Sequence, residues 1–216
     1  MTDPNGEQVQ RVTLYFDPAC PWTWRTSRWL VGAATTRGVP VEYAALELTA
    51  GADVKEVPSE RRAAAAASRM FLRGVTAARA EGRHDLIGRW YTLFGTSRWD
   101  DHAEPTGDLV RNTLVSAGGD DLFAALDDAG LDDPMAASRS EALDWAGDDV
   151  GSPVTVWDLG EHRRGFFGPV VAPKPVGSES DTLWEAVRNL VVAPDFFEIK
   201  ARRTHDPVGA SGESHS

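Results

Sequence analysis

The only cysteine of the chain, Cys20, lies where a strand is predicted to end and a helix to begin. Apolar residues alternate over 11–16, an Asp-Pro turn signal follows, and apolar residues then recur at helical spacing over 21–36. A further apolar run at 41–48 is typical of a second strand. Strand, helix and strand in this order predict a βαβ unit with parallel strands and a right-handed crossover.

A cysteine at the start of a helix is a candidate nucleophile. Unpaired backbone N–H groups and the positive end of the helix dipole point toward such a sulfur, which favours the thiolate and predicts a lowered pKa for Cys20. Pro21 suits the first turn because its missing N–H has no helical partner there. We expect Asp17 to cap the turn rather than face the thiol. The alternative is that Cys20 is a small, buried and inert apolar residue.

Strand signals are absent from residues 51–149, which are rich in alanine and predict an all-helical insertion. Its helices are predicted over 60–82, 85–94, 108–117, 121–129 and 135–146. Strand signals return at 153–157 and 164–171, joined by a hairpin turn, and helices are predicted over 178–192 and 195–203. We expect residues 1–10 and 207–216 to be flexible tails.

Charge and composition exclude several classes of partner. The formal net charge is −11, from 22 basic and 33 acidic residues, so phosphate backbones and anionic membranes are repelled. A single cysteine excludes an internal disulfide, the scattered histidines lack ligand spacing, and no metal is expected. Neither a secretion signal nor a long apolar run is visible. These features predict a cytoplasmic protein without a nucleic-acid or membrane partner.

Several segments resemble one known family, the actinobacterial DsbA-like thioredoxin-fold proteins close to the mycothiol-dependent nitroreductases. They are Tyr15–Leu30, Asp149–Pro153, Gly165–Val170, Leu183-Trp184 and Phe196–Lys200. The resemblance implies an α/β, thioredoxin-like (DsbA-type) domain formed by 11–50 and 150–203, with the helical insertion 51–149 between its halves. It also implies Cys20 as nucleophile, a cis-proline at Pro153, and mycothiol as the thiol that supplies electrons.

The sequence departs from the family at one important position. The family's usual centre is Cys-Pro-Trp-Cys, whereas Thr23 replaces the second cysteine here and leaves a monothiol centre. A mixed disulfide at Cys20 must then be resolved by a second small thiol from solution. The Thr23 hydroxyl, one turn into the helix, is in a position to donate a hydrogen bond to the thiolate. The alternative is a β-branched filler left after redox function was lost.

Other residues are candidates for contact with the substrate: Pro21, Trp22, Ser152, Trp99 and His102. Trp22 is predicted to line a pocket for a flat aromatic or sugar-bearing molecule, whereas Trp24 and Trp29 are expected in the core. The segment 95–102 is predicted to be a loop that folds over the cysteine as a lid. For His102, a solvated loop histidine is the simpler interpretation.

We therefore predict a monothiol oxidoreductase that reduces mixed disulfides or electrophilic small molecules such as nitroaromatics. Its partners are a small-molecule thiol and the substrate, and it is expected to be a monomer or a weak homodimer. One alternative is a thiol transferase or isomerase similar to the kappa-class glutathione transferases. The other is a thioredoxin-fold binding protein without catalysis.

Overall fold

A mixed four-stranded sheet forms the centre of the computed structural model, which describes residues 8–51, 58–172, 174–204 and 206–207. The strand order is β2-β1-β3-β4. β1 and β2 are parallel and joined by α1, as the βαβ prediction requires, whereas the β1–β3 and β3–β4 pairs are antiparallel. The elements are β1 (Arg11–Phe16), α1 (Pro21–Thr35), β2 (Val41–Ala45), β3 (Val154–Asp158) and β4 (Arg163–Phe167).

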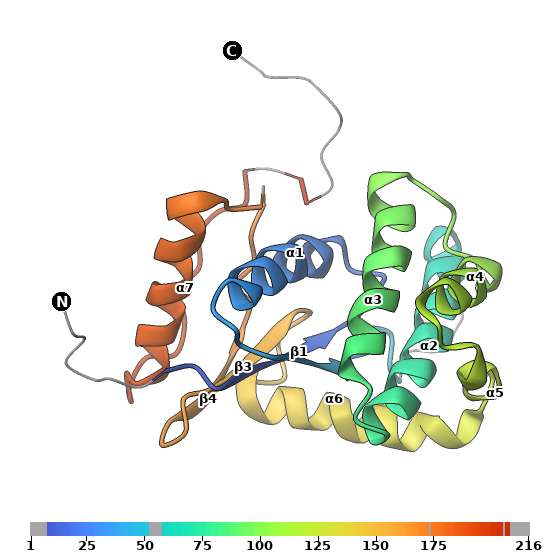
Figure 1. Cartoon of the computed structure of the whole chain (residues 1–216), viewed down its shortest axis with the longest axis horizontal. Coiled ribbons are helices and arrows are strands. Elements are labelled where there is room, and N and C mark those ends of the chain that lie inside the picture. The colour runs from blue at the N-terminus through green and yellow to red at the C-terminus, as the bar shows by residue number, and fades with distance from the viewer. Residues whose placement is uncertain (1–7, 52–57, 173, 205, 208–216) are drawn as a thin grey trace, which may run out of the picture.

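The alternation in β1 separates two cores, one on each face of the sheet. Val12, Leu14 and Phe16 pack in the cluster that contains the apolar side chains of α1 and α7 (Gly177–Val191). Tyr15 points the opposite way and packs with residues of β3 and of α6 (Asp132–Ala146). Figure 1 shows α1 and α7 on one side of the sheet and α6 on the other. A period of two in the sequence thus places α1 against one defined face.

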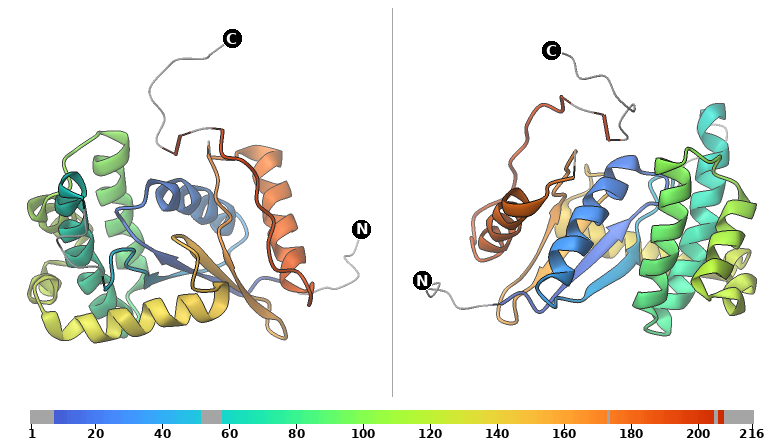
Figure 2. Two further views of the ribbon diagram at one scale, coloured as in Figure 1. Left: turned by 180° about the vertical axis from the view of Figure 1, so that it is seen from behind. Right: turned by 45° about the horizontal axis from the view of Figure 1, so that its top comes forward.

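The remaining helices come between β2 and β3 in the sequence. They gather at one end of the sheet (Figures 1 and 2). The predicted helix over 121–129 is only partly present, because this stretch forms a four-residue α-helix between two short 3-10 helices. The Asp128 carboxylate accepts a hydrogen bond from Gly130 N at 2.8 Å and so starts a new turn. The helical elements here are α2 (Ser59–Ala80), α3 (His84–Gly95), the π-helix η1 (Thr96–Asp100), α4 (Gly107–Ala117), η2 (Asp120–Leu122), α5 (Phe123–Leu126) and η3 (Ala129–Leu131).

Two strands are shorter than predicted. β2 ends at Ala45 rather than at residue 48, and the Leu48 N–H donates to the Asp17 carboxylate at 2.8 Å instead of continuing the ladder. β4 ends at Phe167 rather than at residue 171. Gly168 has a φ of 97°, and the next residue is a proline that cannot donate to a ladder.

Both ends of the described chain also differ from expectation. Val9 is buried and Gln10 N donates to Asp158 O at 2.8 Å, so the fold begins before residue 11. The predicted helix over 195–203 is absent. Residues 194–195 form a turn, in which Phe196 N donates to Ala193 O at 3.4 Å, and Arg164 of β4 donates to the carbonyl oxygens of Ala193 and Phe196. Residues 1–7 and 208–216 of the predicted tails, and 52–57 of the predicted insertion, lie outside the described residues.

Candidate functional site

Cys20 is the N-cap residue of α1, as its place in the sequence predicts. It has extended backbone angles (φ −93°, ψ 113°), its carbonyl accepts the Trp24 N–H at 3.2 Å, and Pro21 follows in the first turn. Its own N–H donates to Asp17 O at 3.0 Å, which closes the turn after β1. The residue is 7% exposed. The thiol is therefore placed at a helix start, on a residue that is almost fully buried.

A distant segment meets the cysteine from the other side. The Ser152–Pro153 peptide bond is cis, and the Cys20 thiol donates to the Ser152 carbonyl oxygen at 3.4 Å. These residues are 132 positions apart in sequence. The structure thus brings together the Cys20 helix start and the Pro153 segment, the two motifs that carried the family resemblance.

Thr23 and Ser152 form a buried pair of hydroxyls beside the sulfur. Their oxygens are 2.7 Å apart, and Ser152 Oγ also accepts the Asp17 N–H at 3.0 Å. Thr23 has no exposed surface and Ser152 is 5% exposed. Ser152 was predicted to contact the substrate, but its hydroxyl is directed into the protein and already has two partners. Its carbonyl is the group that faces the cysteine.

The predicted lowering of the Cys20 pKa is wrong in its net direction. Burial raises the pKa of the Cys20 thiol, because the thiolate loses hydration, and the negative charge of Asp17 raises it further. A hydrogen bond from the Thr23 side chain and the backbone N–H groups of Thr23 and Trp22 act in the opposite direction. The helix start therefore favours the thiolate as expected, but burial has the larger effect.

Asp17 caps the turn, and its carboxylate is fully used by the protein. Oδ1 accepts the Ala19 N–H at 2.8 Å and the Ser68 hydroxyl at 2.5 Å, while Oδ2 accepts the Leu48 N–H at 2.8 Å. The residue is 2% exposed, and burial raises the pKa of its carboxyl. Sequence reasoning anticipated the turn but not Ser68, which comes from α2, 51 residues away.

The outer wall of the site contains residues from the C-terminal segment. Trp22 is half-buried, and the Arg203 guanidinium lies over its ring, 4.6 Å from the centroid. Arg25 Nε donates to Pro207 O at 2.7 Å, so the same segment also contacts the next turn of α1. Nothing in the sequence near Trp22 indicates a partner 181 residues away, and Arg203 was missed.

The predicted lid segment 95–102 packs beside the cysteine as the π-helix η1 rather than as an irregular loop. Trp99 Nε1 donates to Pro18 O at 3.3 Å, two residues before Cys20. Asp100 pairs with Arg25 of α1 at 3.4 Å. His102 is exposed with a φ of 58°, and no contact found among the described residues joins it to the cysteine.

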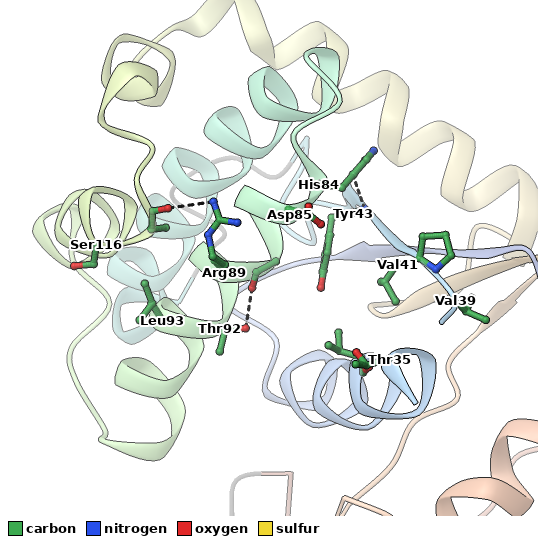
Figure 3. A pocket seen from close by; sticks show the side chains of 14 residues that line it. Thr35, Val39, Val41, Tyr43, His84, Asp85, Arg89, Thr92, Leu93 and Ser116 are labelled. Carbon is green, nitrogen blue, oxygen red and sulfur yellow. Dashed lines mark hydrogen bonds between the residues drawn. The ribbon is translucent and has the colours of Figure 1, made fainter. Parts of the chain in front are cut away.

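A pocket of about 540 Å³ lies elsewhere, between α1, β2, α3 and α4 (Figure 3). Its α1 residues begin at Val31, about 16 Å along the helix from Cys20 at 1.5 Å per residue. Its polar groups already serve the fold. His84 Nδ1 accepts the Tyr43 N–H at 3.1 Å, and Arg89 contacts the Ala117 carbonyl, at the end of α4, at 3.5 Å. This pocket is separate from the cysteine, which is not among its lining residues.

Two other kinds of feature are absent from the described residues. No group of three or more His, Cys, Asp or Glu side chains there is arranged to hold a metal ion. In that part of the chain, no helix has the length and apolar character needed to cross a membrane.

Comparisons with known proteins agree with the geometry. A family model described as "Rv2466c-like: Mycothiol-dependent nitroreductase Rv2466c" matches residues 19–201. The uncharacterized protein Rv2286c of Mycobacterium tuberculosis is 27% identical over 199 residues, which cover 88% of this chain and 80% of that protein.

Two solved structures are similar in fold. The probable DsbA oxidoreductase SCO1869 from Streptomyces coelicolor has a TM-score of 0.56 at 19% identity, over 94% of this chain and 97% of its own. The cytosolic disulfide reductase DsbM from Pseudomonas aeruginosa also has a TM-score of 0.56, at 14% identity, over 83% of this chain and 99% of its own. The predicted DsbA-like thioredoxin fold is thereby confirmed.

Proposed function

The chain belongs to the Rv2466c-like family of mycothiol-dependent nitroreductases, and from that premise we propose that it is a monothiol oxidoreductase with Cys20 as its nucleophile. The observation that carries the proposal is the position of the Cys20 sulfur. It lies at the start of α1, 3.4 Å from the carbonyl of the residue before the cis-proline Pro153. This position supports thiol chemistry, because a substrate sulfur can approach between the helix start and the proline loop.

The first step is an exchange at a disulfide. The Cys20 thiolate attacks one substrate sulfur, a bond forms between the two sulfurs, and the substrate's S–S bond breaks. The other half of the substrate leaves as a thiolate and takes the electron pair of the broken bond. The thiol form of Cys20 must first lose its proton to water, and the raised pKa makes this the pH-sensitive part of the step.

Resolution needs a thiol from outside the chain, because Thr23 occupies the second cysteine position and no other cysteine exists. An incoming thiolate attacks the substrate-side sulfur, and Cys20 leaves as a thiolate with the electron pair. The two steps together exchange one disulfide for another. A nitroaromatic substrate would instead take two electrons and two protons from two thiols, which end as one disulfide.

The residues around the sulfur suit a small sugar-bearing thiol such as mycothiol. The half-buried indole of Trp22 and the Arg203 guanidinium that lies over it border the helix start, and together they offer an aromatic edge and hydrogen-bond donors to a sugar. When bound, this thiol supplies the second sulfur that the chain lacks. We place the reaction in the cytoplasm, where thiols are kept reduced.

Replacing Cys20 by serine tests the proposal. The purified protein is assayed for mycothiol-dependent reduction of hydroxyethyl disulfide and of a nitroaromatic compound. We expect turnover to disappear with Cys20→Ser, because a serine hydroxyl is not ionised near neutral pH and does not attack disulfides. Oxidised mycothiol should accumulate in stoichiometric amount with the substrate consumed.

The controls separate the alternatives. Ser116→Ala, an exposed substitution in α4, should leave turnover unchanged. Turnover that needs Cys20 but releases no oxidised mycothiol would indicate a transferase or an isomerase. Unchanged turnover in Cys20→Ser would contradict the proposal.

A further inference from the structure

The buried hydroxyls of Ser152 and Thr23 are joined by hydrogen bonds beside Cys20. Ser152 Oγ lies 3.0 Å from Asp17 N and 2.7 Å from Thr23 Oγ1. A backbone N–H can only donate, so Ser152 Oγ accepts from Asp17 and keeps its own proton for another partner. The other partner in reach is Thr23. Either hydroxyl can be the donor in this contact, and when Ser152 is the donor the Thr23 proton stays free for another acceptor.

In the described structure, the Thr23 hydroxyl lacks the acceptor that is usual for a helical threonine. A threonine hydroxyl inside a helix usually donates to the carbonyl four residues earlier, as Thr35 does to Val31 O at 2.7 Å and Thr92 to Gly88 O at 2.7 Å. The described residues show no such bond for Thr23. The Thr23 side chain instead acts on Cys20, where it lowers the pKa of the thiol against the larger effect of burial. Thr23 is thus the last member of a chain that ends on the cysteine.

We propose that Ser152 is a positioning residue, whose hydroxyl holds Thr23 so that the Thr23 proton points at the Cys20 sulfur. The relay runs from the Asp17 N–H through Ser152 and Thr23 to Cys20. The inference rests on the proposed function, in which Cys20 reacts as a thiolate. It also reassigns Ser152, because a side chain that is 5% exposed and has two partners acts on the nucleophile rather than on the substrate.

Ser152 acts on both protonation states of the cysteine. In the thiol state, the S–H donates to the Ser152 carbonyl at 3.4 Å. When the proton leaves to water, that bond is lost and the hydroxyl of Thr23 becomes a donor to a charged sulfur. A hydrogen bond to an ionised acceptor is about twice as strong as one between neutral groups. In a buried site, each bond of the chain polarises the next.

Two further titratable groups interact electrostatically with Cys20, Asp17 from the preceding turn and Tyr91 from α3. The Asp17 carboxylate takes its hydrogen bonds from Ala19, Ser68 and Leu48 and none from Ser152 or Thr23. Tyr91 is fully buried, and burial raises the pKa of its hydroxyl. Substitutions at Ser152 and Thr23 therefore leave the hydrogen bonds of the Asp17 carboxylate in place.

Pairs of isosteric variants test the relay, with the pKa of Cys20 measured from the pH dependence of its alkylation by iodoacetamide. Valine has nearly the shape of threonine but a methyl group in place of the hydroxyl. Ser152→Val compared with Ser152→Thr, and Thr23→Val compared with the native protein, therefore each isolate the effect of one hydroxyl. We expect Thr23→Val to raise the pKa by about one pH unit or more, the size of one hydrogen bond to a charged group. Ser152→Val should also raise it, and Ser152→Thr should keep it near the native value.

The double variant is decisive. Once Thr23→Val has removed the last donor, adding Ser152→Val should produce no further shift in the pKa. Additive shifts, or a native pKa in Ser152→Val, would overturn the relay. If Ser152→Val does not fold by circular dichroism, Ser152→Ala is measured in its place against the same double variant. Because alkylation needs no turnover, a failed relay and a failed enzymatic function give different results.

Discussion

Single residues set the chemistry of this site through opposing effects on one sulfur. The start of α1 and the Thr23 hydroxyl favour the thiolate, whereas burial and the charge of Asp17 favour the thiol. Burial has the largest effect, so the thiol is held protonated to a higher pH than a free cysteine. A cysteine of this kind is protected from unselective oxidation, because the thiolate is the reactive form. A substrate or small thiol that donates a hydrogen bond to the sulfur would then lower the pKa of Cys20 and favour its ionisation.

Asp17 offers a test at this scale. Asp17→Asn removes the negative charge, so the pKa of Cys20 should fall when it is measured by pH-dependent alkylation. The same change places an amide where the carboxylate accepts three hydrogen bonds, including that of the Leu48 N–H. We expect the free energy of unfolding to fall by about 1–3 kcal/mol, the cost of a buried unsatisfied group, in urea denaturation.

Asp101→Asn is the matched control for Asp17→Asn, because Asp101 is exposed and loses the same charge. It should change neither the pKa of Cys20 nor the stability. A Cys20 pKa that rises or stays constant in Asp17→Asn would show that the charge of Asp17 does not act on the thiol.

At the scale of elements, α3 packs directly on α1 at Gly95, which has no side chain. A Cβ atom at Gly95 would lie 2.2 Å from the ring of Trp24, which is closer than any packing allows. The Trp24 ring also meets Tyr91 of α3, with centroids 5.6 Å apart, and Trp24 Nε1 donates to Asp100 of η1 at 3.3 Å. The glycine therefore brings the helices of 51–149 against the first turns of α1.

Gly95→Ala should test this contact. We expect a loss of about 1–3 kcal/mol in the free energy of unfolding, because the added methyl group forces Trp24 or α3 to move. Gly32→Ala is the matched control within α1, where the nearest atom is 3.8 Å away. That change should stabilise the protein by about 0.5–1 kcal/mol through helix propensity. Equal effects of the two substitutions in thermal or urea unfolding would contradict the packing argument.

At the scale of the whole molecule, three distant parts of the chain surround the cysteine. The Ser152–Pro153 loop lies against the sulfur, η1 lies beside the preceding turn, and the C-terminal segment covers Trp22. Figure 2 shows the chain after α7 returning toward α1. The opening to Cys20 is thus bounded by residues from both halves of the sheet domain and from the helices between them.

The C-terminal contact predicts a change in access to the thiol. Arg203→Ala removes the guanidinium from the face of Trp22, so Cys20 should react about two- to five-fold faster with iodoacetamide, as expected for the loss of a contact of about 0.5–1 kcal/mol. Arg202→Ala is the matched control, since the neighbouring arginine is exposed and makes no contact with α1 in the described structure. Equal rates in the two variants would show that the segment does not restrict access.

The sequence determined the local framework of the protein. Strand 11–16, the helix that starts at Pro21 and the all-helical run before 153 follow from periodicity and turn residues, which are properties of neighbouring positions. The burial of Trp24 and Trp29 was predicted correctly for the same reason. The family resemblance could also be read from short motifs.

Only the tertiary structure decided the environment of the sulfur. The sign of the Cys20 pKa shift depends on how deeply the packed fold buries the thiol, and local helix geometry does not encode this. The internal role of the Ser152 hydroxyl, the Ser68 bond to Asp17 and the place of Arg203 over Trp22 join residues 51 to 181 positions apart. Hydration and hydrogen bonding at a buried atom are set by every segment that surrounds it, so they follow from the assembled fold alone.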